Sequence, residues 1–157
     1  MMIILSDHVR YAIVQHAEAT YPNECVGLLI GRIDESRIAV EDIFPTPNRW
    51  TVETGLTPTD AEHSQRDRFY LDPRDYLRAD RAARARHLDV VGCYHSHPDH
   101  PATPSPRDLT GAQGVGGGSQ FVFLIQSVID GRAAELTAWT LDESAARFVA
   151  EEIVVVC

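Results

Sequence analysis

The sequence predicts an α+β protein in which helices flank a mixed β-sheet, and three observations support this fold class. Several short apolar segments separated by turn residues are typical of β-strands. The segments on either side of Asp130-Gly131 have the pattern of an antiparallel hairpin. Two further segments carry apolar residues at helical spacing. Hairpin-linked strands with helices between them indicate helices packed on a sheet.

The first third of the chain predicts a short edge strand, a helix and a hairpin. Residues 2–5 form the apolar run of the edge strand. Ser6 is the expected N-cap of a helix over 6–20, because Val9, Ile13 and Ala17 would share one apolar face and Pro22 would end it. A buried strand at about 25–32 and a second at 37–44 complete the hairpin across the Asp34–Ser36 turn.

The rest of the chain predicts a long loop followed by alternating helices and strands. Residues 50–68 are polar and broken by proline, which indicates a surface loop with a turn of helix. The expected elements after it are a short strand at 68–71, a helix from Asp72-Pro73 to about 87, strands at 89–97, 120–128 and 134–141, a short helix from Asp108 to about 113, and a last strand within 147–156. The inward positions of the helix that starts at Asp72 are expected to be Tyr76, Leu77, Ala79, Ala83 and Leu88.

Composition narrows the class of function. The 157 residues fit one domain, 1–157, and the formal net charge of −9 with no lysine argues against binding to nucleic acid. The sequence has no apolar run of 18 residues, so no membrane segment is expected. Three cysteines are too few for a disulfide framework, which makes the cytoplasm the expected location. The oligomeric state is not determined by these features.

The stretch from Gly92 to Asp108 concentrates the residues that could bind a metal. On a strand, His95 and His97 point to the same face about 6.6 Å apart at the backbone, so two imidazoles could converge on one ion. A proline-rich loop leads to Asp108, which could add an oxygen ligand. Three protein ligands would leave the fourth position of Zn²⁺ open for water. Asp99 or His100 could replace Asp108, and Cys93 shares the histidine face, although a buried packing role fits Cys93 better.

The segment Ser105-Pro-Arg-Asp108 has a second, purely structural interpretation. Serine as N-cap, proline at the first helical position and an acid three residues after the cap form a capping box. The two interpretations are compatible, because the start of a helix can direct Asp108 towards a metal held by the preceding strand.

These residues together resemble the signature of the JAMM (MPN+, Mov34/PAD-1) zinc metalloproteases, in particular the compact bacterial branch. The resemblance comprises Glu24 ahead of Gly27-Leu28-Leu29, then His95-Ser96-His97-Pro98, seven residues from His97 to Ser105, and Asp108. It implies a partly barrel-like sheet with a cytidine-deaminase-like core. It also implies that His95, His97 and Asp108 bind one zinc ion with its water, that Glu24 is the general base and acid, and that Ser105 assists the tetrahedral intermediate.

The resemblance further implies hydrolysis of a peptide or isopeptide bond after the Gly-Gly tail of a ubiquitin-like or sulfur-carrier protein. Zinc lowers the pKa of its bound water to about 7 and polarises a carbonyl, so the expected nucleophile is the zinc-bound water. Two alternatives stay open: a non-catalytic scaffold domain of the same fold, and a zinc amidohydrolase that acts on a small-molecule amide.

Overall fold

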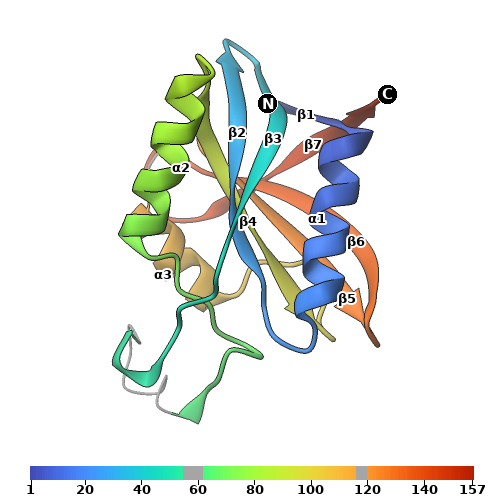
Figure 1. Ribbon diagram of the computed structural model, residues 1–157, viewed down its shortest axis with the longest axis vertical. Coiled ribbons are helices and arrows are strands. Elements are labelled where there is room, and N and C mark those ends of the chain that lie inside the picture. Colours follow the sequence, from blue (N-terminus) through green and yellow to red (C-terminus); the bar gives the residue numbers. More distant parts are fainter. Residues whose placement is uncertain (55–61, 116–119) are drawn as a thin grey trace.

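The computed structural model describes residues 1–54, 62–115 and 120–157, apart from the side chain of Val115. Seven strands form a closed, mixed barrel in the order β1-β3-β2-β4-β5-β6-β7, which confirms the α+β fold class. Helix α1 (Asp7–Thr20) covers one side of the barrel, and helices α2 (Pro73–Ala85) and α3 (Pro106–Val115) lie on the other (Figure 1). The remaining elements are β1 (Met2–Ser6), β2 (Val26–Asp34), β3 (Arg37–Thr46), a 3-10 turn η1 (Val52–Thr54), β4 (Asp89–Pro98), β5 (Val122–Ile129), β6 (Arg132–Leu141) and β7 (Phe148–Val156).

Strand β1 is not the edge strand that the sequence predicts. It pairs in parallel with β3 on one side and with β7 on the other, with Ile3 opposite Ile38 and Ile153. It therefore closes the barrel, and both Ile3 and Leu5 are fully buried. A parallel partner from the far end of the chain leaves no local pattern in residues 2–6, so the apolar run alone could not distinguish a central strand from an edge strand.

Helix α1 packs as predicted. The Ser6 side chain accepts a hydrogen bond from the Val9 backbone N–H at 3.1 Å, which caps the helix. Val9, Ile13 and Ala17 are fully buried in a core that also includes the fully buried side chain of Tyr94. The β2–β3 and β5–β6 hairpins are also confirmed, with antiparallel pairing throughout.

The region before and within α2 differs from the prediction in two places. Leu77 is 48% exposed instead of buried, because Ala79 and Ala83 define the buried face and Leu77 lies well to one side of it. The predicted strand at 68–71 is also wrong. Its backbone is held mainly by the Asn48 side chain, which donates to the Arg68 carbonyl and accepts from the Tyr70 N–H, so no strand ladder forms. Part of the predicted 50–68 loop, residues 55–61, lies outside the described residues.

Strand β4 lies between β2 and β5 in the barrel and carries the two histidines. It is antiparallel to β2, where His95 lies opposite Val26, and parallel to β5, where His95 lies opposite Ile125. Glycine is required at position 92 because a Cβ there would lie 2.1 Å from the Val122 carbonyl oxygen. No helix in the described residues is long and apolar enough to span a bilayer.

Candidate metal centre

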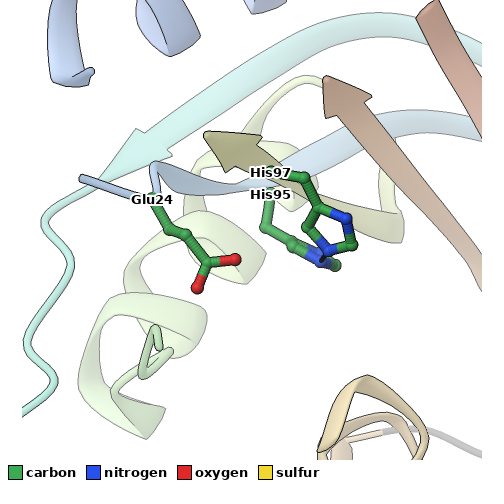
Figure 2. A group of neighbouring side chains, drawn as sticks. All are labelled: Glu24, His95 and His97. Atoms are coloured by element: carbon green, nitrogen blue, oxygen red, sulfur yellow. Dashed lines mark hydrogen bonds between the residues drawn. The ribbon is translucent and has the colours of Figure 1, made fainter. Parts of the chain in front are cut away.

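The structure brings His95, His97 and Asp108 together at the end of β4. The Nε2 atoms of the two histidines are 3.1 Å apart. The Asp108 carboxylate lies 3.3 Å from His95 Nε2 and 3.0 Å from His97 Nε2. Glu24 completes the group, since it offers a carboxylate oxygen within 4.8 Å of nitrogen atoms from both histidines. Figure 2 shows the Glu24 carboxylate and the two imidazoles extending towards the same space.

The separations within this group fit a tetrahedral metal site. With bonds of 2.0–2.1 Å, two ligand atoms of a tetrahedral zinc ion lie about 3.3 Å apart. The three separations among His95, His97 and Asp108 are all near this value. The donor set of two imidazoles and one carboxylate also suits zinc and leaves one position for water or substrate.

The orientation of His97 is set by a backbone carbonyl. Its Nδ1 lies 2.8 Å from the Pro101 oxygen, and because a carbonyl can only accept, Nδ1 carries the proton and Nε2 faces the group. The loop around Pro101 is held on both sides: Ser127 donates to the His100 carbonyl and Thr137 donates to the Ala102 carbonyl, each at 2.6 Å. Such outer contacts fix the tautomer and direction of a metal-binding imidazole.

His95 and Asp108 are held by different contacts. The ring of Phe69 stacks on His95 with centroids 4.5 Å apart. Burial alone would raise the pKa of Asp108, but the charge of His95 and the hydrogen bonds from both histidines outweigh it and hold the pKa well below its usual range. Asp108 therefore stays ionised, as a carboxylate ligand must.

Ser105 and Asp108 also form the predicted capping box. The Ser105 N–H donates to Asp108 Oδ2 at 2.9 Å, and the Asp108 N–H donates to Ser105 Oγ at 3.0 Å. The same carboxylate thus caps α3 and faces the histidines. In the cap the Ser105 hydroxyl only accepts a hydrogen bond, so its role as a cap leaves its proton available as a donor.

Glu24 is buried, 4% exposed, just before β2. Its backbone N–H donates to the Gln65 carbonyl at 2.7 Å, and its own carbonyl accepts from the Asn48 side chain. The neighbouring Cys25 N–H donates to the hydroxyl of Ser96, the residue between the two histidines, at 2.8 Å. Burial, followed by the nearby carboxylates of Asp108 and Asp67, raises the pKa of Glu24 well above its ordinary value. A raised pKa makes the Glu24 carboxylate a stronger base, which suits it to accept a proton.

The other residues considered from the sequence lie apart from this group. The Asp99 carboxylate accepts from the Tyr21 hydroxyl and the Asp130 N–H, and His100 is exposed. Cys25 packs in the α1-side core, on the opposite face from Glu24 as strand alternation predicts. Cys93 is buried, and burial raises the pKa of its thiol to about 12.

A pocket of about 440 Å³ adjoins the group. Glu24, His95 and Asp108 form part of its polar lining. Aromatic and aliphatic side chains from several elements line the remainder, including Phe69, Tyr76, Phe123, Ile125 and Phe148. Of the predicted 50–68 loop, the described residues that line the pocket are Asp67 and Arg68.

The fold and this arrangement of residues agree with a comparison against protein families. The family model of prokaryotic homologues of the JAB domain matches residues 6–142. The chain belongs to this family. The match confirms the recognition made from the Glu24, His-x-His and Ser-x-x-Asp pattern.

Relatives within this family have several named roles. The chain is 35% identical over 92 residues to a probable TtuB-protein conjugate cleaving protease of Thermus thermophilus, covering 59% of this chain and 51% of that protein. It is 39% identical over 102 residues to the tail tip assembly protein K of Escherichia phage N15, covering 65% of this chain and 32% of that protein. It is 44% identical over 43 residues to a desampylase of Pyrococcus furiosus, covering 27% and 31%. The matches thus span about half or less of these relatives' length.

A solved structure shares this fold over nearly the whole chain. A protein from Desulfitobacterium hafniense with a known solution structure superposes with a TM-score of 0.76 and 27% identity, covering 99% of this chain and 93% of that one. The family, the relative named as a protease and the group of side chains that could bind a metal together favour a hydrolytic function.

Proposed function

We propose that this protein is a zinc metallopeptidase that cleaves a peptide or isopeptide bond after the Gly-Gly tail of a ubiquitin-like or sulfur-carrier protein. The observation that carries this proposal is the convergence of His95, His97 and Asp108 at separations near 3 Å, with the buried Glu24 beside them. His95 Nε2, His97 Nε2 and a carboxylate oxygen of Asp108 would hold the ion. A zinc ion bound there would supply a Lewis acid for the scissile carbonyl and would acidify a water molecule.

Glu24 moves the proton in this proposal. Its raised pKa lets the carboxylate accept a proton from the attacking water and pass it to the departing amine. The bond between the carbonyl carbon and the nitrogen breaks, and the amine leaves with the proton that Glu24 delivers. The position of Glu24 is maintained by Asn48, Gln65 and, through Cys25, by Ser96.

Ser105 is proposed to stabilise the oxygen of the substrate carbonyl. Its hydroxyl oxygen already accepts from the Asp108 N–H, which leaves its proton to donate to a developing negative charge. One such donor is worth about 10²-fold or more in rate.

The names of two relatives support the proposed substrate class. Both have names that refer to the removal of protein conjugates, one cleaving TtuB conjugates and one called a desampylase. A tail that ends in two glycines has no side chains to clash near the enclosed metal group. The scaffold alternative is supported by the name of one relative, a phage tail tip assembly protein.

Zinc content and hydrolysis of carrier proteins with C-terminal extensions test the proposal together. Glu24→Gln should keep zinc and lose hydrolysis by about 10²-fold or more, because the amide cannot carry the proton. Asp108→Asn should lose both. Asp99→Asn is the matched control, since Asp99 is a nearby carboxylate outside the group, and it should keep both.

The outcomes separate the alternatives. Unimpaired hydrolysis by Glu24→Gln contradicts the proton role, and loss of zinc in Asp99→Asn but not in Asp108→Asn contradicts the ligand assignment. A wild-type protein that binds zinc but releases nothing from any carrier supports the scaffold alternative, and turnover of free amides alone supports the amidohydrolase.

A further inference from the structure

The direction of the His97 imidazole depends on one carbonyl group in the turn after β4. His97 Nδ1 lies 2.8 Å from the Pro101 carbonyl oxygen, which fixes the proton on Nδ1 and leaves Nε2 facing the metal group. Residues 99–102 belong to neither a strand nor a helix. The position of this carbonyl therefore depends on other contacts that hold the turn, and the β5–β6 hairpin supplies them.

A hydroxyl group holds the turn on each side of Pro101. Ser127 of β5 donates to the carbonyl of His100 at 2.6 Å. Thr137 of β6 donates to the carbonyl of Ala102, also at 2.6 Å. Because the peptide groups before and after the Pro101 carbonyl are both anchored, the range over which that carbonyl can move is narrow.

Trp139 directs the Thr137 hydroxyl towards the turn. The Trp139 indole N–H, which can only donate, donates to Thr137 Oγ1 at 2.8 Å. The single hydroxyl proton of Thr137 then remains for the Ala102 carbonyl. Ala102 is 1% exposed, so its carbonyl would be left buried and without this hydrogen bond if the hydroxyl were removed. The contact between Thr137 and the turn is therefore costly to break.

Ser127 is directed towards the turn by a β-bulge. The β5–β6 pairing shifts register between Gln126 and Val128, so Ser127 is passed over in this ladder. The buried Gln126 side chain donates to carbonyls of β6 at 3.2 Å, which supports the bulge. In the pairing with β4, Ser127 lies opposite His97, so the two side chains lie on the same face of the sheet. Bulges often redirect a side chain beside an active site, and here the redirected hydroxyl is the one that anchors the turn.

We propose that Ser127 and Thr137 are positioning residues for the metal centre, acting through the Pro101 carbonyl and His97. In the proposed function, on which this inference rests, His97 Nε2 binds zinc. Neither hydroxyl belongs to the group that would hold the ion, and each acts by fixing the turn that sets the direction of the imidazole. Loss of an outer contact of this kind costs about 10- to 100-fold in metal affinity. The β5–β6 hairpin thus contributes to zinc affinity from outside the metal group.

Thr137 allows the hydroxyl to be tested separately from the shape of the side chain. Thr137→Val removes the hydroxyl and keeps the branched shape, whereas Thr137→Ser keeps the hydroxyl and removes the methyl group. Ser127→Ala removes the second hydroxyl and tests the inference independently if Thr137→Val does not fold. Thr140→Val is the matched control, because Thr140 lies on the same strand and donates to Glu151 at 2.7 Å instead of to the turn.

Zinc affinity is measured for each protein by competition with a chelator. The solvent exchange of the His97 Nδ1 proton is followed by NMR in the zinc-loaded protein with isotope-labelled histidine. Thr137→Val and Ser127→Ala should each bind zinc about tenfold or more weakly, and the Nδ1 proton should exchange faster, because the turn holds its carbonyl less firmly. Thr137→Ser and Thr140→Val should resemble wild type in both measurements. A general loss of stability, which Thr140→Val also causes, would not change the His97 signal selectively.

Hydrolysis of carrier proteins by wild type, measured beside these affinities, separates failure of this inference from failure of the proposed function. Wild-type zinc affinity in both Ser127→Ala and Thr137→Val overturns the inference, as does an equal loss of affinity in Thr140→Val. Unchanged affinities together with active hydrolysis contradict the positioning role and support the peptidase. Weaker zinc binding in the two variants, without hydrolysis by wild type, supports the positioning role and contradicts the peptidase.

Discussion

At the scale of single residues, the charge state of Glu24 depends on a balance among its neighbours. Burial and the carboxylates of Asp108 and Asp67 raise its pKa, while the guanidinium groups of Arg68 and Arg107 oppose them. A base must be ionised to accept a proton, so activity should fall as the pH is lowered through the pKa of Glu24. The neighbouring charges therefore set the pH range over which Glu24 can act as a base.

Arg68→Gln should move the acid limb of the pH–rate profile to higher pH. The change removes a positive charge that stabilises the ionised Glu24 carboxylate, so the pKa of Glu24 rises further. Glu24 then becomes ionised only at higher pH. The measurement is kcat/KM against pH for both proteins. Arg86→Gln serves as the control, because Arg86 pairs with Asp42 on the surface and should leave the profile unchanged. An acid limb at the same pH in Arg68→Gln would contradict the electrostatic account.

At the scale of elements, β4 positions the metal group because it is fixed on both sides. It pairs with β2 and β5, and Gly92 allows the close approach of β5. Helix α3 then places Asp108 in its first turn, where Ser105 and Asp108 cap each other. Strand pairing and helix capping therefore act on the same few side chains.

Gly92→Ala should reduce both stability and zinc affinity. The new methyl group would lie 2.1 Å from the Val122 carbonyl oxygen, so β4 and β5 must separate three residues before His95. A loss of about 1–3 kcal/mol in the free energy of unfolding is expected, measured by chemical denaturation beside a zinc titration. Gly114→Ala, where a Cβ would meet no atom of the described residues within 4 Å, should instead be neutral or stabilising. Equal stability of Gly92→Ala and wild type would show that the strands adjust freely.

At the scale of the whole molecule, the metal group depends on the complete fold. Its residues come from the segment just before β2, the end of β4 and the start of α3, so only the folded chain brings these three segments together. Zinc that binds the folded state alone must stabilise it.

Zinc should therefore raise the melting temperature, and a chelator should reverse the effect. At a free concentration 100 times the dissociation constant the gain is about 2.7 kcal/mol. A chain of this size then melts several degrees higher, since about 1 kcal/mol corresponds to roughly 2–4 °C. Scanning calorimetry of wild type and His95→Ala tests this, because the variant lacks one ligand and should not respond. A shift of the same size in His95→Ala would place the stabilising zinc elsewhere.

The sequence by itself determined the features that depend on neighbouring residues. Helical spacing at Val9, Ile13 and Ala17 located α1, and alternation placed His95 and His97 on one face. The Ser105 and Asp108 cap followed from spacing as well. Glu24 entered only through the family resemblance, because no local pattern connects it to residues so far along the chain.

The tertiary structure alone decided how these parts meet. It made β1 the closing strand of the barrel, left residues 68–71 bound to Asn48 instead of a strand, and turned Leu77 outwards. It also formed the apolar pocket from residues of α2, α3, β4, β5 and β7. Periodicity reports the face that a segment buries, but the partner on that face comes from long-range packing, which no single segment encodes.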